Sequence, residues 1–251
     1  MLCNCKIKNF FMQVSYNFNM LPIKDTIRSR SFPYINWLLI LINSLIFLYQ
    51  INLTPTQLDV FIHHFALVPE NINLAKPITW YSFITHIFLH GGWLHIISNM
   101  WVLYIFGDNV EDRLGSLRYL IFYLLGGISA GVLQYIFSID ASIPALGASG
   151  AIAAIMGAYL LFFPHSRVIT FIPIFFFGWF VEIPSIVFLG IWFLTQLFSG
   201  LMALSTPSNM HMGGIAWWAH VGGFLFGLLL AYIFTIGYRG RREYRDEYYP
   251  W

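Results

Sequence analysis

Four polar residues have types and spacings that suit acyl transfer: Ser149 in "GASG", His220 in "AHVGG", and His95 with Asn99 in "HIISNM". A serine hydroxyl becomes an effective nucleophile when a neighbouring base takes its proton, and an imidazole such as that of His220 is a common base. The His95 ring and the Asn99 amide could donate hydrogen bonds to the oxyanion that forms on the attacked carbonyl. We therefore predict a catalytic Ser149–His220 dyad, with His95 and Asn99 in the oxyanion hole.

The composition sets the environment in which these residues must meet. Of the 251 residues, 58% are hydrophobic and 10% are charged, and the mean hydropathy of +0.69 lies far above that of soluble globular domains. Six apolar runs contain no Asp, Glu, Lys or Arg; they cover residues 34–51, 93–107, 119–138, 148–163, 183–204 and 216–238. Because lipid offers the backbone no hydrogen-bond partners, such runs must be helices. We predict an all-α membrane protein, a bundle of six transmembrane helices.

The polar residues fall at one depth in this arrangement. The second, fourth and sixth runs cross in the same direction, and His95, Ser149 and His220 each lie near the start of one of them. His95 and Asn99 are four residues apart and share a helix face. A lone serine among small residues usually serves helix packing, and a lone histidine could be an interhelical hydrogen-bond partner. These separate roles leave the common depth unexplained, whereas a shared catalytic site explains it.

Four glycines on the segments that carry the serine and the histidine would allow close packing. Gly147 and Gly150 permit a tight turn around Ser149, because glycine has no Cβ to obstruct the backbone. Gly223 and Gly227 form a small-residue strip on the sixth run. Small residues let helices approach closely in lipid, so this strip should pack against the helix that bears Ser149.

The basic residues predict the orientation of the chain. Twelve of the 13 lysines and arginines fall on one side of the predicted membrane, and only Lys76 falls on the other. The positive-inside rule then places both termini in the cytoplasm and the serine near the outer face. The net charge of +2 reflects this topology and does not indicate nucleic-acid binding. We predict a cytoplasmic tail over residues 1–33, with Met20 as a candidate natural start, a membrane domain over 34–238 and a cytoplasmic tail over 239–251.

The connections between the runs carry further expectations. Residues 52–92 should form short helical pieces in the membrane interface, and the apolar segment 164–184, broken by three prolines, should form an interfacial loop. The segment "GDNVEDRLGSLRY" should be a solvated, salt-bridged turn. Cys3 and Cys5 are assigned no function.

His86 and His90 raise the question of a metal site. Their spacing of four residues could suggest metal ligands, but "HIFLH" lacks the glutamate that serves as the base in H-E-x-x-H zinc hydrolases. We expect these histidines to order the first loop through hydrogen bonds, and we predict no metal site.

The ordered motifs "HGGWLHIISN", "GDNVEDRLG", "GASGA" and "AHVGG" resemble those of the rhomboid intramembrane serine proteases of the bacterial six-span type, from about Met20 to residue 238. The resemblance implies that Ser149 is the nucleophile and His220 its base. It also implies that His95, Asn99 and the Ser149 amide form the oxyanion hole, and that no cofactor is needed. Two positions depart from some members of the family. Ala153 replaces a tyrosine that stacks on the catalytic histidine, and Tyr81 replaces the arginine of a Trp-Arg pair.

The resemblance implies a serine endopeptidase that cleaves transmembrane segments of other membrane proteins near the outer face. The expected partners are such substrates and membrane lipids, not nucleic acid, and the expected location is a bacterial plasma membrane. The fifth span and the first loop would form the lateral access route, by analogy with the family. The alternative is a non-proteolytic rhomboid-like protein that binds transmembrane helices. A transporter is disfavoured because no ionisable Asp, Glu, Lys or Arg lies within a span. The oligomeric state is left open.

Overall fold

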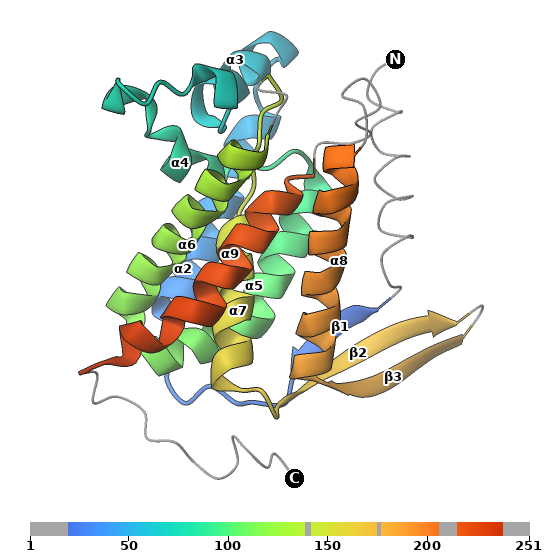
Figure 1. Cartoon of the computed structure of the whole chain (residues 1–251). Coiled ribbons are helices and arrows are strands. Elements are labelled where there is room, and N and C mark those ends of the chain that lie inside the picture. Colours follow the sequence, from blue (N-terminus) through green and yellow to red (C-terminus); the bar gives the residue numbers. More distant parts are fainter. Residues whose placement is uncertain (1–19, 139–141, 175–176, 206–214, 238–251) are drawn as a thin grey trace.

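The computed structural model describes residues 20–138, 142–174, 177–205 and 215–237. This part of the chain is mostly helical, and its six longest apolar helices coincide with the six predicted runs (Figure 1). They are α2 (Tyr34–Ile51), α5 (Trp93–Leu114), α6 (Ser116–Phe137), α7 (Ser149–Phe162), α8 (Ser185–Ser205) and α9 (Trp217–Leu230), the last continued by the 3-10 helix η5 (Ala231–Thr235).

Four of these helices are long and apolar enough to cross a membrane: α2, α6, α8, and α9 together with η5. Helix α7 is apolar but has only 14 residues. Helix α5 has 22 residues, of which the last seven include four charged side chains. Length and composition thus identify four candidate spans within the described part of the chain.

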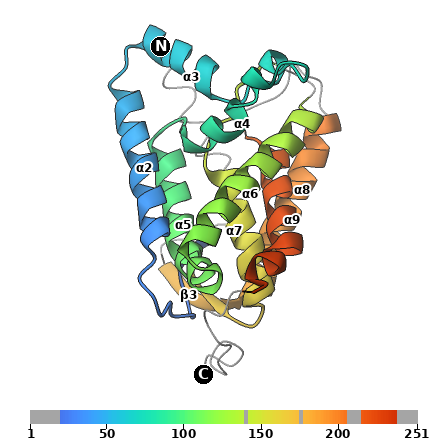
Figure 2. The same ribbon diagram turned by 90° about the vertical axis from the view of Figure 1, so that its left-hand side faces the viewer.

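Helix α7 lies in the middle of the bundle. It contacts α5, α6, α8 and α9, and Figures 1 and 2 show it enclosed by them. Its buried face consists largely of alanine and glycine, with Ala153, Ala154 and Ala158 fully buried. Because lipid tails are as apolar as the side chains, close van der Waals packing must hold such a helix in place. The small side chains on α7 make that packing possible.

The first connection folds into short helical pieces at one end of the bundle, as predicted. They are α3 (Pro55–Phe65), the 3-10 turns Pro69–Asn71 and Pro77–Thr79, α4 (Ser82–Thr85) and the 3-10 turn His86–Phe88. Thr54 and Gln57 form a capping box that begins α3. Leu67 pairs with Ala145 through two backbone hydrogen bonds, which tie this connection to the segment just before α7.

The prediction of an all-α fold is wrong in one region. Residues expected to form an interfacial loop form two antiparallel strands, β2 (Arg167–Ile174) and β3 (Phe177–Pro184), and β2 also pairs with β1 (Leu21–Asp25). The residues of β2 are mainly β-branched and aromatic, which favours a strand. The run is almost continuously apolar, so it lacks the alternation by which a strand is usually recognised. Figure 1 shows this sheet extending sideways from the end of the bundle opposite α3.

The expected solvated turn is also wrong. Helix α5 continues to Leu114, and α6 begins two residues later, after Gly115, whose φ of 81° ends the first helix. Glu111 is buried, and its carboxylate accepts hydrogen bonds from the backbone N–H groups of Ile35 (3.0 Å) and Asn36 (2.7 Å). These N–H groups belong to the first turn of α2 and have no partner within their own helix. Glu111 therefore caps α2.

Part of the predicted N-terminal tail belongs to the folded structure. Strand β1 lies within residues 1–33, and a carboxyl oxygen of Asp25 at its end accepts hydrogen bonds from Tyr159 Oη (2.6 Å) and Asn109 Nδ2 (2.9 Å). These bonds join β1 to α7 and α5. Residues 1–19 and 238–251, which include Cys3, Cys5 and the predicted C-terminal tail, lie outside the described residues.

Asp25 should make stability depend on pH. Loss of surrounding water, together with the charge of Asp108, raises the pKa of Asp25 from its ordinary 3.8 to about 8. Between these values the folded chain holds a proton that the unfolded chain has released, so the free energy of unfolding falls as pH rises through this window. Buried histidines such as His86 act in the opposite sense below their ordinary pKa of 6.5, so the test uses the pH range above that value. We expect the thermal midpoint of the wild type in detergent to fall between pH 7 and pH 8.5, and that of Asp25→Asn to fall much less.

Asp59→Asn is the matched control, because Asp59 is an exposed aspartate on α3. Its curve should parallel that of the wild type. Parallel curves for Asp25→Asn and the wild type would contradict the assignment of the pH dependence to Asp25.

Candidate active site

The structure brings Ser149 and His220 into direct contact. Ser149 is the first residue of α7 and His220 is the fourth residue of α9, and His220 Nε2 lies 2.8 Å from Ser149 Oγ. This is hydrogen-bond distance. Both side chains are partly buried. The contact has the geometry that a histidine needs to accept the proton of a serine nucleophile.

A close approach of α7 and α9 permits this contact. A Cβ atom placed on Gly223 would lie 1.9 Å from the carbonyl oxygen of Gly150, and one on Gly227 would lie 1.9 Å from that of Ala154. Both distances are too short for any side chain. The two helices therefore touch backbone to backbone along the glycine strip. Gly150 allows α7 to approach α6 just as closely, because a Cβ placed on Gly150 would lie 2.5 Å from the Cβ of Ala130.

His95 lies beside the turn that precedes Ser149. Gly147 has a φ of +132°, and a Cβ there would lie 2.7 Å from His95 Nε2 and 3.7 Å from Ser149 Oγ. The backbone N–H of Gly91 donates to His95 Nδ1 at 3.3 Å, so the neutral ring carries its proton on Nε2. His95 thus presents an N–H donor close to the serine, and only glycine at position 147 leaves room for it.

Asn99 is a buried donor without a partner. It lies one turn after His95 on α5 and is 7% exposed, and its Nδ2 makes no hydrogen bond to any described residue. Buried polar groups are nearly always hydrogen-bonded, so an unpaired amide calls for an explanation. An acceptor oxygen placed beside it would complete its bonding. No hydrogen bond joins Asn99 to Ser149 or His220 within the described residues.

Two residues near the dyad escaped the sequence reasoning. Gln196 on α8 is buried, and its Oε1 lies 2.7 Å from His220 Nδ1. Trp192, one turn earlier, has its ring centre 5.8 Å from that of His220. Trp192 thus supplies aromatic packing on the histidine, which Ala153 cannot. The available sequence signal for Gln196 was an amide within a largely apolar run, a pattern that does not by itself distinguish a residue of the site from one of helix packing.

His86 and His90 make contacts within the first connection. His86 Nδ1 lies 2.8 Å from the carbonyl oxygen of Ser82, and burial lowers the pKa of His86 to about 4, so the ring is neutral and donates this bond. The backbone of His90 exchanges two hydrogen bonds with the side chain of Gln50 on α2. The imidazole of His86 therefore helps to order the loop, as expected, whereas the ring nitrogens of His90 make no hydrogen bond to a described residue and only the backbone of His90 takes part. In the described part of the chain, no three His, Cys, Asp or Glu side chains gather as metal ligands would.

Comparison with known proteins identifies the family. The profile of the Rhomboid domain matches residues 77–236, which contain all four predicted catalytic residues. The chain belongs to the rhomboid family. Together with its apolar helices, this makes it an integral membrane protein.

Three relatives illustrate the range of similar proteins. RHOMBOID-like protein 6, mitochondrial, of Arabidopsis thaliana is 31% identical over 168 residues, which cover 65% of this chain and 47% of that protein. Rhomboid protease GluP of Bacillus subtilis is 35% identical over 129 residues, covering 51% of this chain and 24% of that protein. The mouse presenilin-associated rhomboid-like protein, mitochondrial, is 27% identical over 183 residues, which cover 69% of this chain and 42% of that protein. This rhomboid thus spans less than half the length of these relatives.

The glycine strip of this rhomboid should be intolerant of even one methyl group. In Gly223→Ala the new Cβ would overlap the Gly150 carbonyl, so α7 and α9 must separate. Overpacking of this kind costs about 1 to 3 kcal/mol. We expect a clear fall in the thermal midpoint in detergent. Gly190→Ala on α8 is the control, because a Cβ at position 190 meets no atom within 4 Å. Equal midpoints for the two variants would contradict the tight α7–α9 contact.

Proposed function

We propose that this rhomboid is an intramembrane serine endopeptidase that cleaves transmembrane segments of other membrane proteins. The observation that carries the proposal is the 2.8 Å contact between Ser149 Oγ and His220 Nε2 within a bundle of apolar helices. Membership of the rhomboid family supports it, and one relative is itself called a protease.

In the proposed first step, Ser149 Oγ attacks the carbonyl carbon of the scissile peptide bond while His220 Nε2 takes the hydroxyl proton. The imidazolium then gives this proton to the leaving nitrogen, the C–N bond breaks, and an acyl-serine remains. In the second step a water molecule attacks the acyl-serine and loses its proton to His220, which returns that proton to Ser149 Oγ. No cofactor is required for this sequence.

The negative charge that develops on the carbonyl oxygen would be held by three donors. They are the backbone N–H of Ser149, which lies in the first turn of α7 without an intrahelical partner, the Nε2–H of His95 and the Nδ2 of Asn99. Donors that are fixed in a water-poor site stabilise the transition state more than water does. The unpaired amide of Asn99 suits this role, because it need not break a bond before binding the oxyanion.

The substrate class follows from the setting of the site. A peptide bond inside a helix is covered by its own hydrogen-bond ladder, so a transmembrane substrate must unwind locally before the serine can reach it. Glycine or proline near the cut lowers the cost of unwinding. We propose lateral access beside α8 and the first connection, by analogy with the family.

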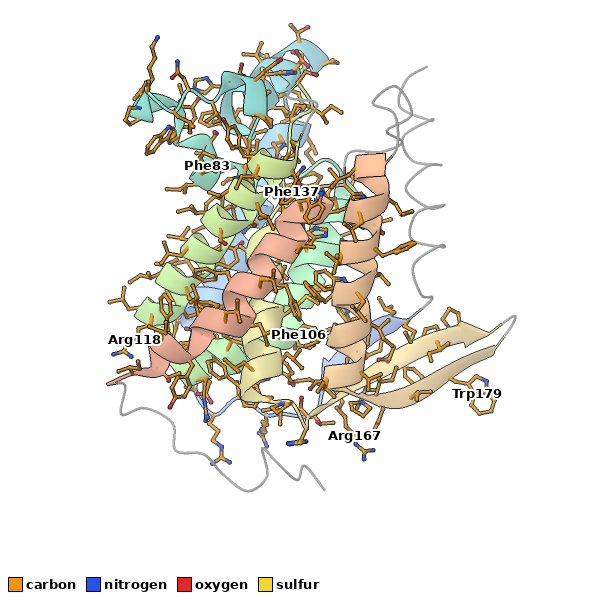
Figure 3. The ribbon with its side chains drawn as sticks, in the orientation of Figure 1. Phe83, Phe106, Arg118, Phe137, Arg167 and Trp179 are labelled. Carbon is orange, nitrogen blue, oxygen red and sulfur yellow. The ribbon has the colours of Figure 1, made fainter. Side chains whose placement is uncertain are left out.

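We further propose that α2 and α5 to α9 all cross the membrane, with both termini in the cytoplasm. Lys76 lies in the first connection, whereas Arg118 and Arg167 lie at the opposite end of the bundle, as Figure 3 shows for the two arginines. This distribution fits the positive-inside rule. Trp179, exposed on β3, would then rest in the cytoplasmic membrane interface, where tryptophan is enriched.

The relatives named above include two mitochondrial proteins, so the comparisons do not favour a bacterial plasma membrane.

The orientation predicts which positions a membrane-impermeant maleimide can reach in intact expressing cells. On a background with Cys3→Ser and Cys5→Ser, Leu74→Cys should react from outside, because Leu74 is exposed in the first connection. Leu117→Cys, exposed at the start of α6, should react only after permeabilisation. The opposite pattern would overturn the proposed orientation.

The dyad predicts loss of proteolysis in two single variants. Purified wild type in proteoliposomes should cleave synthetic single-span substrates near the membrane boundary on the side of α3. Ser149→Ala and His220→Ala should each lower kcat by at least about 10³-fold, because the nucleophile and base act as a unit. Asn99→Ala keeps the nucleophile and the base, and its kcat should fall by about 10²- to 10³-fold, which is the usual effect of removing one oxyanion donor.

The same assay separates the alternative of a non-proteolytic rhomboid-like protein that binds transmembrane helices. If folded wild type cleaves none of the substrates but captures them in pull-downs, catalysis is refuted and the binding function is favoured. Circular dichroism of each variant checks that the fold is retained.

A further inference from the structure

The proposed mechanism does not yet account for a third buried side chain. Gln196 is 5% exposed on α8, a helix without a charged residue, and its Oε1 lies 2.7 Å from His220 Nδ1. A buried amide without a partner is costly, so this contact with the imidazole satisfies both groups. The result is a continuous chain of hydrogen bonds from Ser149 through His220 to Gln196.

The neighbours of Gln196 fix which end of its amide faces the histidine. Thr195 Oγ1 donates its proton to the carbonyl oxygen of Trp192 at 2.6 Å, and lies 3.1 Å from Gln196 Nε2. Since the threonine proton is already engaged, its oxygen can only accept from the amide nitrogen. Gln196 therefore turns its NH2 group to Thr195 and its carbonyl oxygen to His220.

This orientation determines the tautomer of the imidazole. An amide oxygen is only an acceptor, so His220 Nδ1 must carry the ring proton. In the neutral ring Nε2 then has a free lone pair, and it is Nε2 that faces Ser149 Oγ. A general base needs this arrangement, because the nitrogen nearest the nucleophile must be able to accept a proton.

We propose that Gln196 is a positioning residue that holds His220 in the tautomer and ring orientation required of the base, an inference that rests on the proposed serine-protease function. Its role corresponds to one of the two that an aspartate has in a Ser-His-Asp triad, namely orienting the ring. The second role, charge stabilisation of the imidazolium, is absent because the amide is neutral.

A neutral residue suits this position in the bundle. A carboxylate buried among apolar helices carries a large desolvation cost unless a cation pairs with it, and neither α8 nor α9 contains Lys or Arg. An amide in a triad would normally be free to rotate and present its NH2 group to the ring. Here Thr195 prevents that rotation, so the neutral side chain orients the ring without a charge.

The test reads the reactivity of Ser149 directly in the full chain in proteoliposomes, with a fluorophosphonate probe. Attack by Ser149 Oγ forms an O–P bond, fluoride leaves, and the hydroxyl proton passes to His220, so labelling depends on the base and needs no peptide substrate. Labelling rates and the kcat and KM for a cleaved single-span substrate are measured from pH 5 to pH 9.

Gln196→Leu removes the acceptor and keeps a similar volume. We expect its labelling rate and kcat to fall at least about tenfold with KM unchanged, since a general base contributes about 10² to 10⁴. Gln196→Glu restores an acceptor. We expect it to recover activity at high pH, with the acid limb of the pH–rate profile moved to higher pH because a carboxylate stabilises the imidazolium.

Gln134→Leu is the matched control for loss of a glutamine that contacts α9. Gln134 Oε1 accepts from the backbone N–H of Ala219, next to His220, but does not touch the imidazole. Its labelling rate should stay within a few-fold of the wild type and its pH profile should be unchanged.

The outcomes distinguish the two proposals. If the wild type labels at Ser149 and cleaves while Gln196→Leu labels equally fast, the positioning role is refuted and the protease function stands. If Gln196→Leu and Gln134→Leu lose the same fraction of rate and of thermal stability, the role of Gln196 is only structural and the inference fails. A folded wild type that neither labels nor cleaves overturns the protease function, and the inference with it.

Discussion

The structure depends on the contact between the backbones of α7 and α9. Gly223 and Gly227 lie against the carbonyl oxygens of Gly150 and Ala154 so closely that no side chain fits between the two helices. Lipid tails are as apolar as the side chains, so moving an apolar side chain from lipid into a helix contact releases little free energy. The closeness of packing therefore decides how strongly the helices associate. The contact brings Ser149 and His220 within hydrogen-bond distance. The remaining helices then enclose α7, and α5 brings His95 to the turn before the serine.

Much of the helical fold was predictable because one constraint acts on every long apolar segment. A backbone in lipid must satisfy its own hydrogen bonds, so each run without charges becomes a helix, and the order of the runs fixes their alternating directions. The depths of His95, Ser149 and His220 followed from that alternation. The bond between Ser149 and His220 also needed the glycine strip, which the small-residue pattern indicated.

The errors arose where contacts between distant segments decide the outcome. Segment 164–184 forms strands because β2 pairs with β1 as well as with β3, and no local pattern reveals a partner so far away in the chain. Charged residues after position 107 suggested a solvated turn, but Glu111 caps the start of α2, which lies far from it in sequence. Gln196 was missed because an uncharged amide in an apolar helix shows its purpose only when its neighbour in space is known.

Polar groups at the two ends of the bundle differ in kind, with carboxyl side chains at one end and imidazole and amide side chains at the other. At the end where the strands lie, Glu111 satisfies backbone N–H groups and Asp25 accepts bonds from Tyr159 and Asn109. In the described part of the candidate site, Ser149 and His220 hydrogen-bond to each other and to the Gln196 amide, and neither α8 nor α9 contains a Lys or Arg that could balance a carboxylate. The proposed mechanism therefore has no fixed negative charge next to the imidazolium. In the proposed mechanism, transition-state stabilisation would then come mainly from N–H donors placed at the oxyanion, and the unpaired, buried amide of Asn99 suits that need better than a solvated group would.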